Sequence, residues 1–289
     1  MAMPDIRPRR SVLYMPGANA RALEKAASLA CDALIFDLED AVSVDAKAVA
    51  RQQVVEAVTA REYGHREKVV RVNGLDTEWG AADVQAFARA PVDALLFPKM
   101  ESTQQVADIV ACVDAAGGSH LPLWIMIETP TGVLDVRSVA ASSDRIGVLV
   151  MGTSDLVKEL RAQHTESRSN LNFALQQCVL AARSLGLDIL DGVHLDFRNE
   201  DTLRMACDQA RAMGFDGKTL IHPSQVSVAN EIFGYSSEAL EHARGVLDVW
   251  AEAQAQGKGV AVLDGQLVEN LHVAEAERVL AFAEALAVR

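Results

Sequence analysis

Residues 122–128 read PLWIMIE, a short apolar run that ends on a carboxylate, and the sequence repeats this pattern from end to end. Hydrophobicity that is continuous rather than alternating is typical of parallel strands covered on both faces. Each such run is therefore predicted to be a buried strand. The other seven runs are 12–16 (VLYMP), 33–39 (ALIFDLE), 68–73 (KVVRVN), 94–99 (ALLFPK), 147–152 (GVLVMG), 188–193 (DILDGV) and 217–222 (GKTLIH).

Longer segments with apolar residues at helical spacing separate these runs, for example 45–60 (DAKAVARQQVVEAVTA) and 171–186 (LNFALQQCVLAARSLG). The strands begin about 29 residues apart, which is a usual length for a βα unit. Eight such units in succession favour an α/β fold of the closed (β/α)8 type, a TIM barrel, over an open doubly wound sheet. No Gly-x-Gly-x-x-Gly follows the first strand, which removes the usual dinucleotide fingerprint.

Two segments interrupt the repeat. The polar stretch 153–169 is predicted to be a long active-site loop. After the eighth unit, helices are expected at about 236–256 and 273–287, joined by a glycine-containing stretch that suggests a mobile connection. We expect a barrel catalytic domain at 1–234 and a C-terminal helical extension with a lid segment at 235–289.

Composition and charge restrict the class of protein. The 289 residues are 50% hydrophobic, which supports a large core, and 27 basic against 40 acidic residues give a net charge of −13. A general nucleic-acid binder needs a basic surplus, so nucleic acid is not expected as a partner. The apolar runs are far shorter than the ~20 residues of a membrane span, and the N-terminal segment lacks the apolar core of a signal peptide.

The four cysteines indicate a reducing compartment. They lie far apart, without a C-x-x-C pair or zinc-ligand spacing, and buried reduced thiols in a cytoplasmic protein are expected. They are Cys31, Cys112, Cys178 and Cys207.

Polar residues stand at the C-terminal ends of nearly all predicted strands, where barrels of this type place their active sites. Converging carboxylates need a bridging cation, and oxygen ligands without His or Cys suit Mg²⁺. Arg71 and Lys99 supply positive charge for a carboxylate or a developing oxyanion. The residues alone thus predict a site that chelates a small oxyacid on Mg²⁺ and stabilises an enolate. The carboxylates are Asp37, Glu39, Asp40, Glu128 and Asp155.

Other signals are ambiguous or negative. Arg21 and Lys25, one turn apart, either grip phosphates near the barrel mouth or form a solvated helix face. His222 either lines the site or helps strand eight to close the barrel. No Walker A loop, H-x-x-x-H pair or G-x-S-x-G elbow is present, which argues against a P-loop, a zinc site and an α/β-hydrolase. Trp124 is expected in the core.

Taken together in chain order, the motifs resemble the citrate lyase β-subunit-like (CitE-like) branch of the HpcH/HpaI aldolase family, to which malyl-CoA and citramalyl-CoA lyases belong. The resemblance covers about 10–275. The motifs are RSVLYMPG (10–17), DLEDAV (37–42), RVNG (71–74), FPKM (97–100), IET (127–129), GTSDL (152–156) and GFDGKTLIHPSQ (214–225).

The resemblance implies a Mg²⁺-dependent carbon–carbon lyase and a homotrimer or hexamer. Such an enzyme cleaves or forms a 3-hydroxyacyl-CoA, for example malyl-CoA, citramalyl-CoA or citryl-CoA, by Claisen-type chemistry that yields an acyl-CoA and a 2-oxo acid. Two alternatives stay open. One is a citrate lyase β subunit that acts on a thioester carried by an acyl carrier protein. The other is a barrel that binds CoA or a keto acid with weak turnover.

The resemblance also implies roles for individual residues. Glu128 and Asp155 match the metal ligands, Arg71 matches the arginine that contacts substrate and steadies the enolate, and Asp37 and Glu39 match an acidic motif that holds metal-bound water. The remaining substrate-binding residues are backbone groups of Gly152, Thr153 and Ser154 for the keto-acid carboxylate, Tyr14, Pro16, Arg21 and Lys25 along CoA, and Lys99.

One position departs from the family pattern. In lyases of this branch a lid from a neighbouring subunit supplies a catalytic acid, usually Asp, after a Gly-x-Met-hydrophobic stretch. Here the stretch runs from Gly265 to Glu269, so a glutamate stands where aspartate is expected. A proton-transfer group displaced by about an ångström can cost on the order of 100-fold in rate. Glu269 is the predicted lid acid, with Asp264 as the rival.

Overall fold

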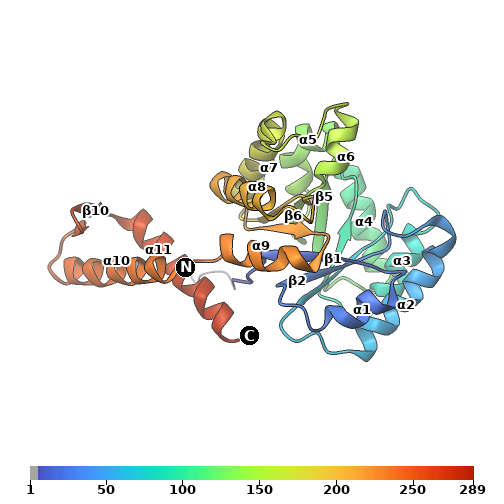
Figure 1. Cartoon of the computed structure of the whole chain (residues 1–289), viewed down its shortest axis with the longest axis horizontal. Coiled ribbons are helices and arrows are strands. Elements are labelled where there is room, and N and C mark those ends of the chain that lie inside the picture. The colour runs from blue at the N-terminus through green and yellow to red at the C-terminus, as the bar shows by residue number, and fades with distance from the viewer. Residues whose placement is uncertain (1–5) are drawn as a thin grey trace. The chain divides into compact units, whose positions relative to one another are not determined.

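The computed structural model describes residues 6–289, and in it eight parallel strands close into a barrel in the order in which they occur along the chain (Figure 1). The predicted (β/α)8 barrel is confirmed, and all eight predicted strands are found. They are β1 (Ser11–Pro16), β2 (Ala33–Asp37), β3 (Glu67–Arg71), β4 (Ala94–Phe97), β5 (Leu123–Ile127), β6 (Ile146–Met151), β7 (Asp188–Asp191) and β8 (Gly217–Leu220).

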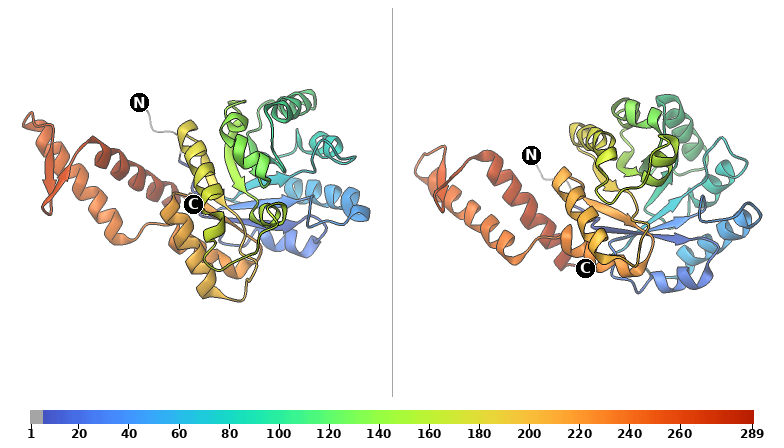
Figure 2. Two further views of the ribbon diagram at one scale, coloured as in Figure 1. Left: turned by 90° about the horizontal axis from the view of Figure 1, so that it is seen from above. Right: turned by 45° about the horizontal axis from the view of Figure 1, so that its top comes forward.

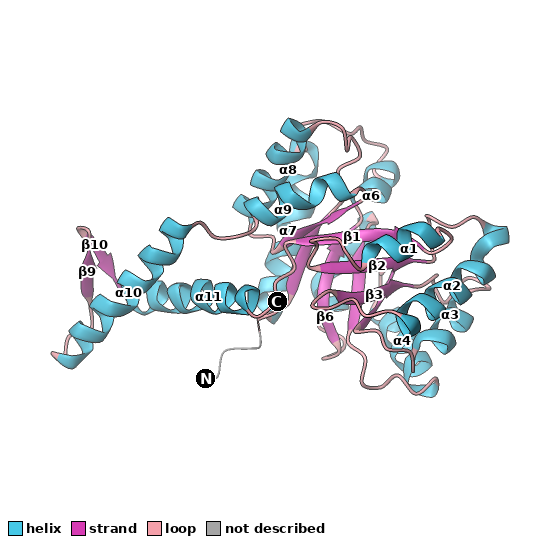
Figure 3. Cartoon of the chain, turned by 60° about the horizontal axis from the view of Figure 1, so that its bottom comes forward, coloured by secondary structure: helices cyan, strands magenta, loops and turns pink. Residues whose placement is uncertain are grey.

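Helices surround the strands and cover their outer faces (Figures 1 and 3). Local signals set several helix ends: Ser102 forms a capping box at the start of α4, and Gly186 and Gly214 end α7 and α8 in the left-handed region. The helices are α1 (Ala20–Ala26), α2 (Lys47–Ala60), α3 (Gly80–Phe87), α4 (Thr103–Ala115), α5 (Pro130–Ala140), α6 (Thr153–Glu159), α7 (Asn172–Leu185), α8 (Glu200–Met213) and α9 (Val226–Ile232).

The barrel has two apolar layers because alternate strand residues point inward and outward. Inward-facing residues such as Ile35, Leu96 and Trp124 fill the interior, and Trp124 is therefore core, as expected. Outward-facing residues such as Leu34 and Phe36 pack beneath the helices. Since side chains fill the interior, substrates have access only to the end of the barrel, where the loops after the strands form its mouth.

The prediction of a long loop at 153–169 was wrong over its first part. Helix α6 begins at Thr153, directly after β6, and a short 3-10 turn follows at Ser169–Leu171. The segment reads as polar because Thr153, Ser154 and Asp155 open the helix and Lys158 and Glu159 end it, yet Leu156 and Val157 anchor it in the core. The mouth residues after β6 therefore stand on a helical first turn, which is more rigid than a loop.

The chain divides into two compact units, Arg9–Phe233 and a second one that combines Gly234–Arg289 with residues 6–8. In the second unit α10 (Ser237–Ala255) and α11 (Asn270–Ala287) run side by side over a small apolar core (Figure 2). Among residues 6–289, no helix is long and apolar enough to cross a membrane.

A hairpin joins these two helices where a mobile connection was expected (Figure 3). Strands β9 (Ala261–Leu263) and β10 (Gln266–Val268) pair antiparallel. The intervening Asp264 and Gly265 have φ of 49° and 79°, the left-handed pair that a two-residue Asp-Gly hairpin turn requires. Asp264 and Gly265 thus make a defined hairpin turn.

Candidate functional site

A buried ion pair joins the ends of β2 and β3 at the barrel mouth. Asp37 and Arg71 are direct neighbours in the register of the two strands. The Asp37 carboxylate accepts hydrogen bonds from Nε and Nη2 of Arg71 at 2.7 and 2.6 Å. The backbone N–H groups of Glu39 and Ala41 donate to the same carboxylate. Because both partners are fixed in this way, the guanidinium has a single orientation.

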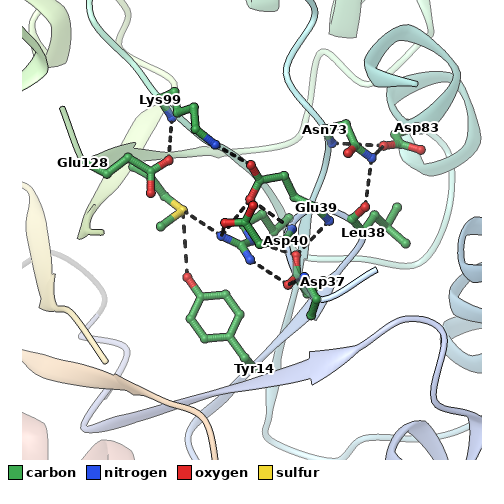
Figure 4. Close-up of polar contacts among 12 residues, drawn as sticks. Tyr14, Asp37, Leu38, Glu39, Asp40, Asn73, Asp83, Lys99 and Glu128 are labelled. Atoms are coloured by element: carbon green, nitrogen blue, oxygen red, sulfur yellow. Dashed lines mark hydrogen bonds and ion pairs between the residues drawn. The ribbon is translucent and has the colours of Figure 1, made fainter. Parts of the chain in front are cut away.

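Further groups contact the Arg71 side chain, among them Tyr14 and Glu39, which Figure 4 labels. Its Nη1 lies 2.9 Å from Oε2 of Glu39, and its guanidinium carbon lies 4.9 Å from the centroid of the Tyr14 ring. Burial disfavours the charged form of Arg71, but the carboxylates of Asp37 and Glu39 outweigh this effect and raise its pKa well above the ordinary value. Arg71 is therefore a permanent, buried positive charge. Burial also raises the pKa of Tyr14, which stays a neutral phenol.

Lys99 connects Glu39 to Glu128 across the mouth (Figure 4). Its Nζ donates to Oε1 of Glu39 at 2.7 Å, and its backbone N–H donates to Oε1 of Glu128 at 2.9 Å. Lys99 has a φ of 53°, a left-handed backbone conformation that is uncommon for residues other than glycine. Such outliers gather at functional sites, where the surrounding contacts hold them.

Glu128 is a deeply buried carboxylate at the mouth, with 1% of its surface exposed. Burial raises its pKa to about 7, although the Arg71 charge acts in the opposite direction. Gly152 packs directly against it, since a Cβ at this glycine would lie 2.3 Å from Oε2 of Glu128. A carboxylate held this deep, with a single backbone donor from Lys99, requires a further positive partner to stay ionised.

The donor set beside Glu128 fits a small hard cation. The Ser154 hydroxyl is buried without a hydrogen-bond partner, and half-buried Asp155 lies in the same first turn of α6. Within residues 6–289, no three His, Cys, Asp or Glu side chains gather closely enough to hold a metal by themselves. One or two carboxylates, with water and substrate oxygens as the other ligands, is the arrangement that Mg²⁺ usually adopts.

Replacing Gly152 by alanine is expected to lower turnover sharply while the chain still folds. The added methyl group would overlap Oε2 and Cβ of Glu128 at 2.3 and 2.4 Å, so either the carboxylate or the α6 turn must shift. A shift of about 1 Å in such a group costs roughly 100-fold in rate. Steady-state kinetics combined with circular dichroism checks this, and Gly147→Ala, where nothing lies within 4 Å, is the matched control. Unchanged kinetics in Gly152→Ala would contradict the close packing.

Sequence reasoning missed the side chain that supports the Asp37–Glu39 turn from below. Lys47 is buried, and its Nζ donates to the carbonyl oxygens of Leu38 and Glu39 at 2.8 and 2.7 Å and to Oδ1 of Asn73 at 2.7 Å. A signal was present: Lys47 occupies the same helical face as the buried Ala50. A lysine within an apolar stripe indicates a buried partner.

A second buried cluster at the mouth was also missed. Asp191, at the end of β7, accepts two hydrogen bonds from Arg168 at 2.6 and 2.7 Å and one from Nζ of Lys218, which is fully buried. Burial works against ionisation, but the charges of Lys218 and Arg168 hold the pKa of Asp191 below its ordinary value. Lys218 also donates to the carbonyl of Gly192. This cluster fixes the wall of the mouth beside α6.

The contacts of this centre do not include the side chains of the remaining predicted substrate-binding and lid residues. Arg21 and Lys25 are exposed on α1, and Pro16 ends β1, where it pairs with Asp37 in the strand register. Glu269 is the N-cap residue of α11 and Asp264 lies in the hairpin turn, so both belong to the second unit. The structure thus brings together six of the predicted residues: Tyr14, Asp37, Glu39, Arg71, Lys99 and Glu128. Gly152 packs against Glu128. Thr153, Ser154 and Asp155 follow Gly152 in the first turn of α6.

Comparison with known proteins assigns a family. Residues 10–223 match the model of the HpcH/HpaI aldolase/citrate lyase family. The (3S)-malyl-CoA thioesterase of Cereibacter sphaeroides strain ATCC 17025 / ATH 2.4.3 is 50% identical over 283 residues, which cover 97% of this chain and 96% of that protein. Citrate lyase subunit beta of Escherichia coli K12 is 34% identical over 289 residues, which cover 98% and 96% of the two chains.

Solved structures agree with this assignment. The CitE protein of Mycobacterium tuberculosis, in complex with magnesium, acetoacetate and coenzyme A, superposes with a TM-score of 0.77 at 28% identity, over 96% of this chain and 100% of that one. RipC from Yersinia pestis superposes with a TM-score of 0.67 at 28% identity, over 79% and 96%. The resemblance of the sequence motifs to a CitE-like protein is therefore confirmed.

Proposed function

The chain belongs to the HpcH/HpaI aldolase/citrate lyase family, and we propose that it hydrolyses malyl-CoA or a closely similar hydroxyacyl-CoA to the free acid and CoA. One observation carries the proposal: the fixed Arg71 guanidinium stands beside buried Glu128 in a chain that is 50% identical to a (3S)-malyl-CoA thioesterase over almost its whole length. Carbon–carbon cleavage of the same ester is the second candidate, favoured by the similarity to citrate lyase subunits.

Each side chain of the site has a part in binding the acid end of such an ester. Arg71 supplies a buried charge for the oxygen that becomes negative, either the tetrahedral oxyanion of hydrolysis or the enolate of cleavage. Asp37 and Glu39 hold that charge in place, so no reorganisation is needed when the oxyanion forms. The backbone N–H groups of Gly152, Thr153 and Ser154 would receive the carboxylate of the acid. In hydrolysis, water adds to the acyl carbon, the carbon–sulfur bond breaks and the thiol takes up the proton.

Glu128 and Asp155 would hold Mg²⁺. Bound there, the ion would neutralise the two carboxylates and would supply a Lewis acid for the hydroxy-acid oxygens of the substrate. The burial of Glu128 and the unpartnered Ser154 hydroxyl support this assignment. Lys99 then orients Glu128 through its backbone N–H, while its ammonium group neutralises Glu39.

A product assay separates the two reactions. Purified protein with Mg²⁺ and malyl-CoA is expected to release malate and free CoA, followed by chromatography and by a thiol reagent. Formation of glyoxylate and acetyl-CoA instead would assign the lyase. If neither hydrolysis nor cleavage is detected with malyl-CoA, citramalyl-CoA or citryl-CoA, the proposal fails. The substrate is then a carrier-bound thioester, or the barrel binds its ligand without turnover.

Glu269→Asp tests whether the lid glutamate sets the outcome. Glu269 supplies the proton-transfer group in our proposal, from a neighbouring subunit of a trimer or hexamer. We expect the shorter aspartate to raise the ratio of glyoxylate to malate by about tenfold or more, because the position of an acid relative to the substrate decides which atom it protonates. Asp264→Glu, measured in the same assay, tests whether the rival residue Asp264 affects the product ratio instead. An unchanged product ratio in Glu269→Asp would remove Glu269 from the mechanism.

A further inference from the structure

Two hydrogen-bond donors at the floor of the mouth converge on one weak acceptor (Figure 4). The Tyr14 hydroxyl lies 3.9 Å from Sδ of Met126, and Nη1 of Arg71 donates to the same sulfur at 3.7 Å. A thioether sulfur accepts hydrogen bonds only weakly. The hydroxyl and this N–H therefore keep most of their hydrogen-bonding capacity for an oxygen atom that enters the mouth beside the sulfur.

The strand pattern explains why these groups lie beneath the mouth. Tyr14 and Met126 come two residues after Val12 and Trp124, and all four side chains belong to the inward-facing layer of the barrel. Met126 is 3% exposed, whereas Tyr14 is only partly buried. Tyr14 and Met126 are thus the last inward residues of β1 and β5 below the charged groups of the site.

Arg71 holds the Tyr14 ring in place. The guanidinium carbon lies 4.9 Å from the ring centroid, which is a cation–π contact. Asp37 in turn fixes the guanidinium through two hydrogen bonds. The position of the phenol oxygen is therefore set before a substrate binds, as the preorganised stabilisation of a developing charge requires.

The phenol of Tyr14 keeps its proton. Burial raises its pKa, and the carboxylates of Asp37 and Glu128 act in the same direction, against the charge of Arg71. Among residues 6–289, the sulfur of Met126 is the only hydrogen-bond partner of the hydroxyl. A neutral phenol without a strong acceptor is a donor for an oxyanion.

We infer that Tyr14 is a catalytic residue whose hydroxyl donates, beside Nη1 of Arg71, to the thioester oxygen as it becomes negative. The inference rests on the proposed function, since it takes a thioester to be the substrate. When water adds to the acyl carbon, the former carbonyl oxygen carries the negative charge until the carbon–sulfur bond breaks. The hydrogen bond strengthens as that charge develops, and the phenol proton stays on Tyr14. Tyr14, which was expected along CoA, is thereby assigned to the reacting end of the ester.

Tyr14→Phe tests the inference, because it removes the hydroxyl and keeps the ring on Arg71. Values of kcat and KM for malyl-CoA are measured with the full-length protein and Mg²⁺. Loss of one oxyanion donor is expected to lower kcat by about 100-fold. KM should change by less than about twofold, since the uncharged oxygen of the bound ester gains little from the hydroxyl.

A binding measurement gives a readout that needs no turnover. Two CoA analogues carry a carboxymethyl group or the corresponding amide in place of the acetyl thioester, so one presents a charged oxygen and the other a neutral one. A hydrogen bond to a charged group contributes more than one to a neutral group. In a calorimeter, Tyr14→Phe should weaken binding of the carboxylate by about 10- to 100-fold and that of the amide by less than about fivefold.

Tyr63→Phe is the matched control. Tyr63 is buried outside the barrel interior, and its hydroxyl donates to the carbonyl oxygen of Leu23. Removal of this hydroxyl should leave kcat, KM and the affinity for both analogues as in the wild type. The inference is wrong if Tyr14→Phe keeps the wild-type kcat, or if it binds the carboxylate analogue as tightly as the wild type does.

Failure of the proposed function gives a different pattern. The wild type could release glyoxylate, or turn over no CoA ester, while Tyr14→Phe still loses affinity for the carboxylate analogue. That result refutes the hydrolysis and supports the donor role of Tyr14. If instead the wild type and Tyr14→Phe hydrolyse malyl-CoA with the same kcat, the activity is supported and the donor role is refuted.

Discussion

Arg71→Lys is expected to lower kcat with malyl-CoA by about 100- to 1000-fold, the usual cost of losing one preorganised oxyanion donor. Lysine keeps the positive charge but presents it as a point, whereas the guanidinium fork binds both oxygens of Asp37 and also reaches Glu39. A lysine ammonium that pairs with Asp37 would lie further from the substrate. The fraction of kcat that remains should be similar for hydrolysis and for cleavage, since both reactions develop negative charge on the thioester oxygen.

The measurement is kcat and KM for malyl-CoA, with the unfolding midpoint determined in parallel. Arg204→Lys is the control, because Arg204 makes a comparable two-pronged pair with Glu231 on the exposed surface and such pairs contribute little to stability. A folded Arg71→Lys protein with wild-type kcat would show that the fork is structural and that another group stabilises the oxyanion.

The sequence predicted the barrel and one half of its mouth because both depend on local pattern. Short continuous apolar runs are typical of strands buried on both faces, and register then places residues at the ends of adjacent strands together. Asp37 and Arg71 are 34 positions apart, yet each ends a strand, and the barrel makes those strands neighbours. Glu128 and Lys99 come together for the same reason.

The features that were missed depend on packing that no local pattern encodes. Arg168 reaches Asp191 from a polar loop. Lys218 lies inside β8, and a single lysine in a short strand gives no sign that a buried carboxylate pairs with it. The partner of a buried charge is visible only in three dimensions. Helix α6 was misread because it is only seven residues long, so its buried positions at Thr153, Leu156 and Val157 cover a single helical repeat.

Glu128→Gln should abolish Mg²⁺ binding and, with it, turnover. The amide is nearly the same size as the carboxylate, and its carbonyl oxygen can still accept the Lys99 N–H, so the local packing survives while the negative charge that attracts the cation is lost. Asp155→Asn should weaken binding as well, but less, because Asp155 is only half-buried and water can replace it. Glu231→Gln, which changes an exposed carboxylate, is the control.

Thermal unfolding gives a readout that is independent of activity. An ion that binds only the folded chain adds stability of about 2.7 kcal/mol at a concentration 100 times its Kd, so Mg²⁺ should raise the Tm of the wild type and of Glu231→Gln but not that of Glu128→Gln. Removal of the ion by EDTA should return the wild type to its lower Tm and stop turnover together, since one site accounts for both effects. If Mg²⁺ raises the Tm of Glu128→Gln as much as that of the wild type, the ion binds elsewhere, and the buried carboxylate must obtain its counter-charge from the substrate.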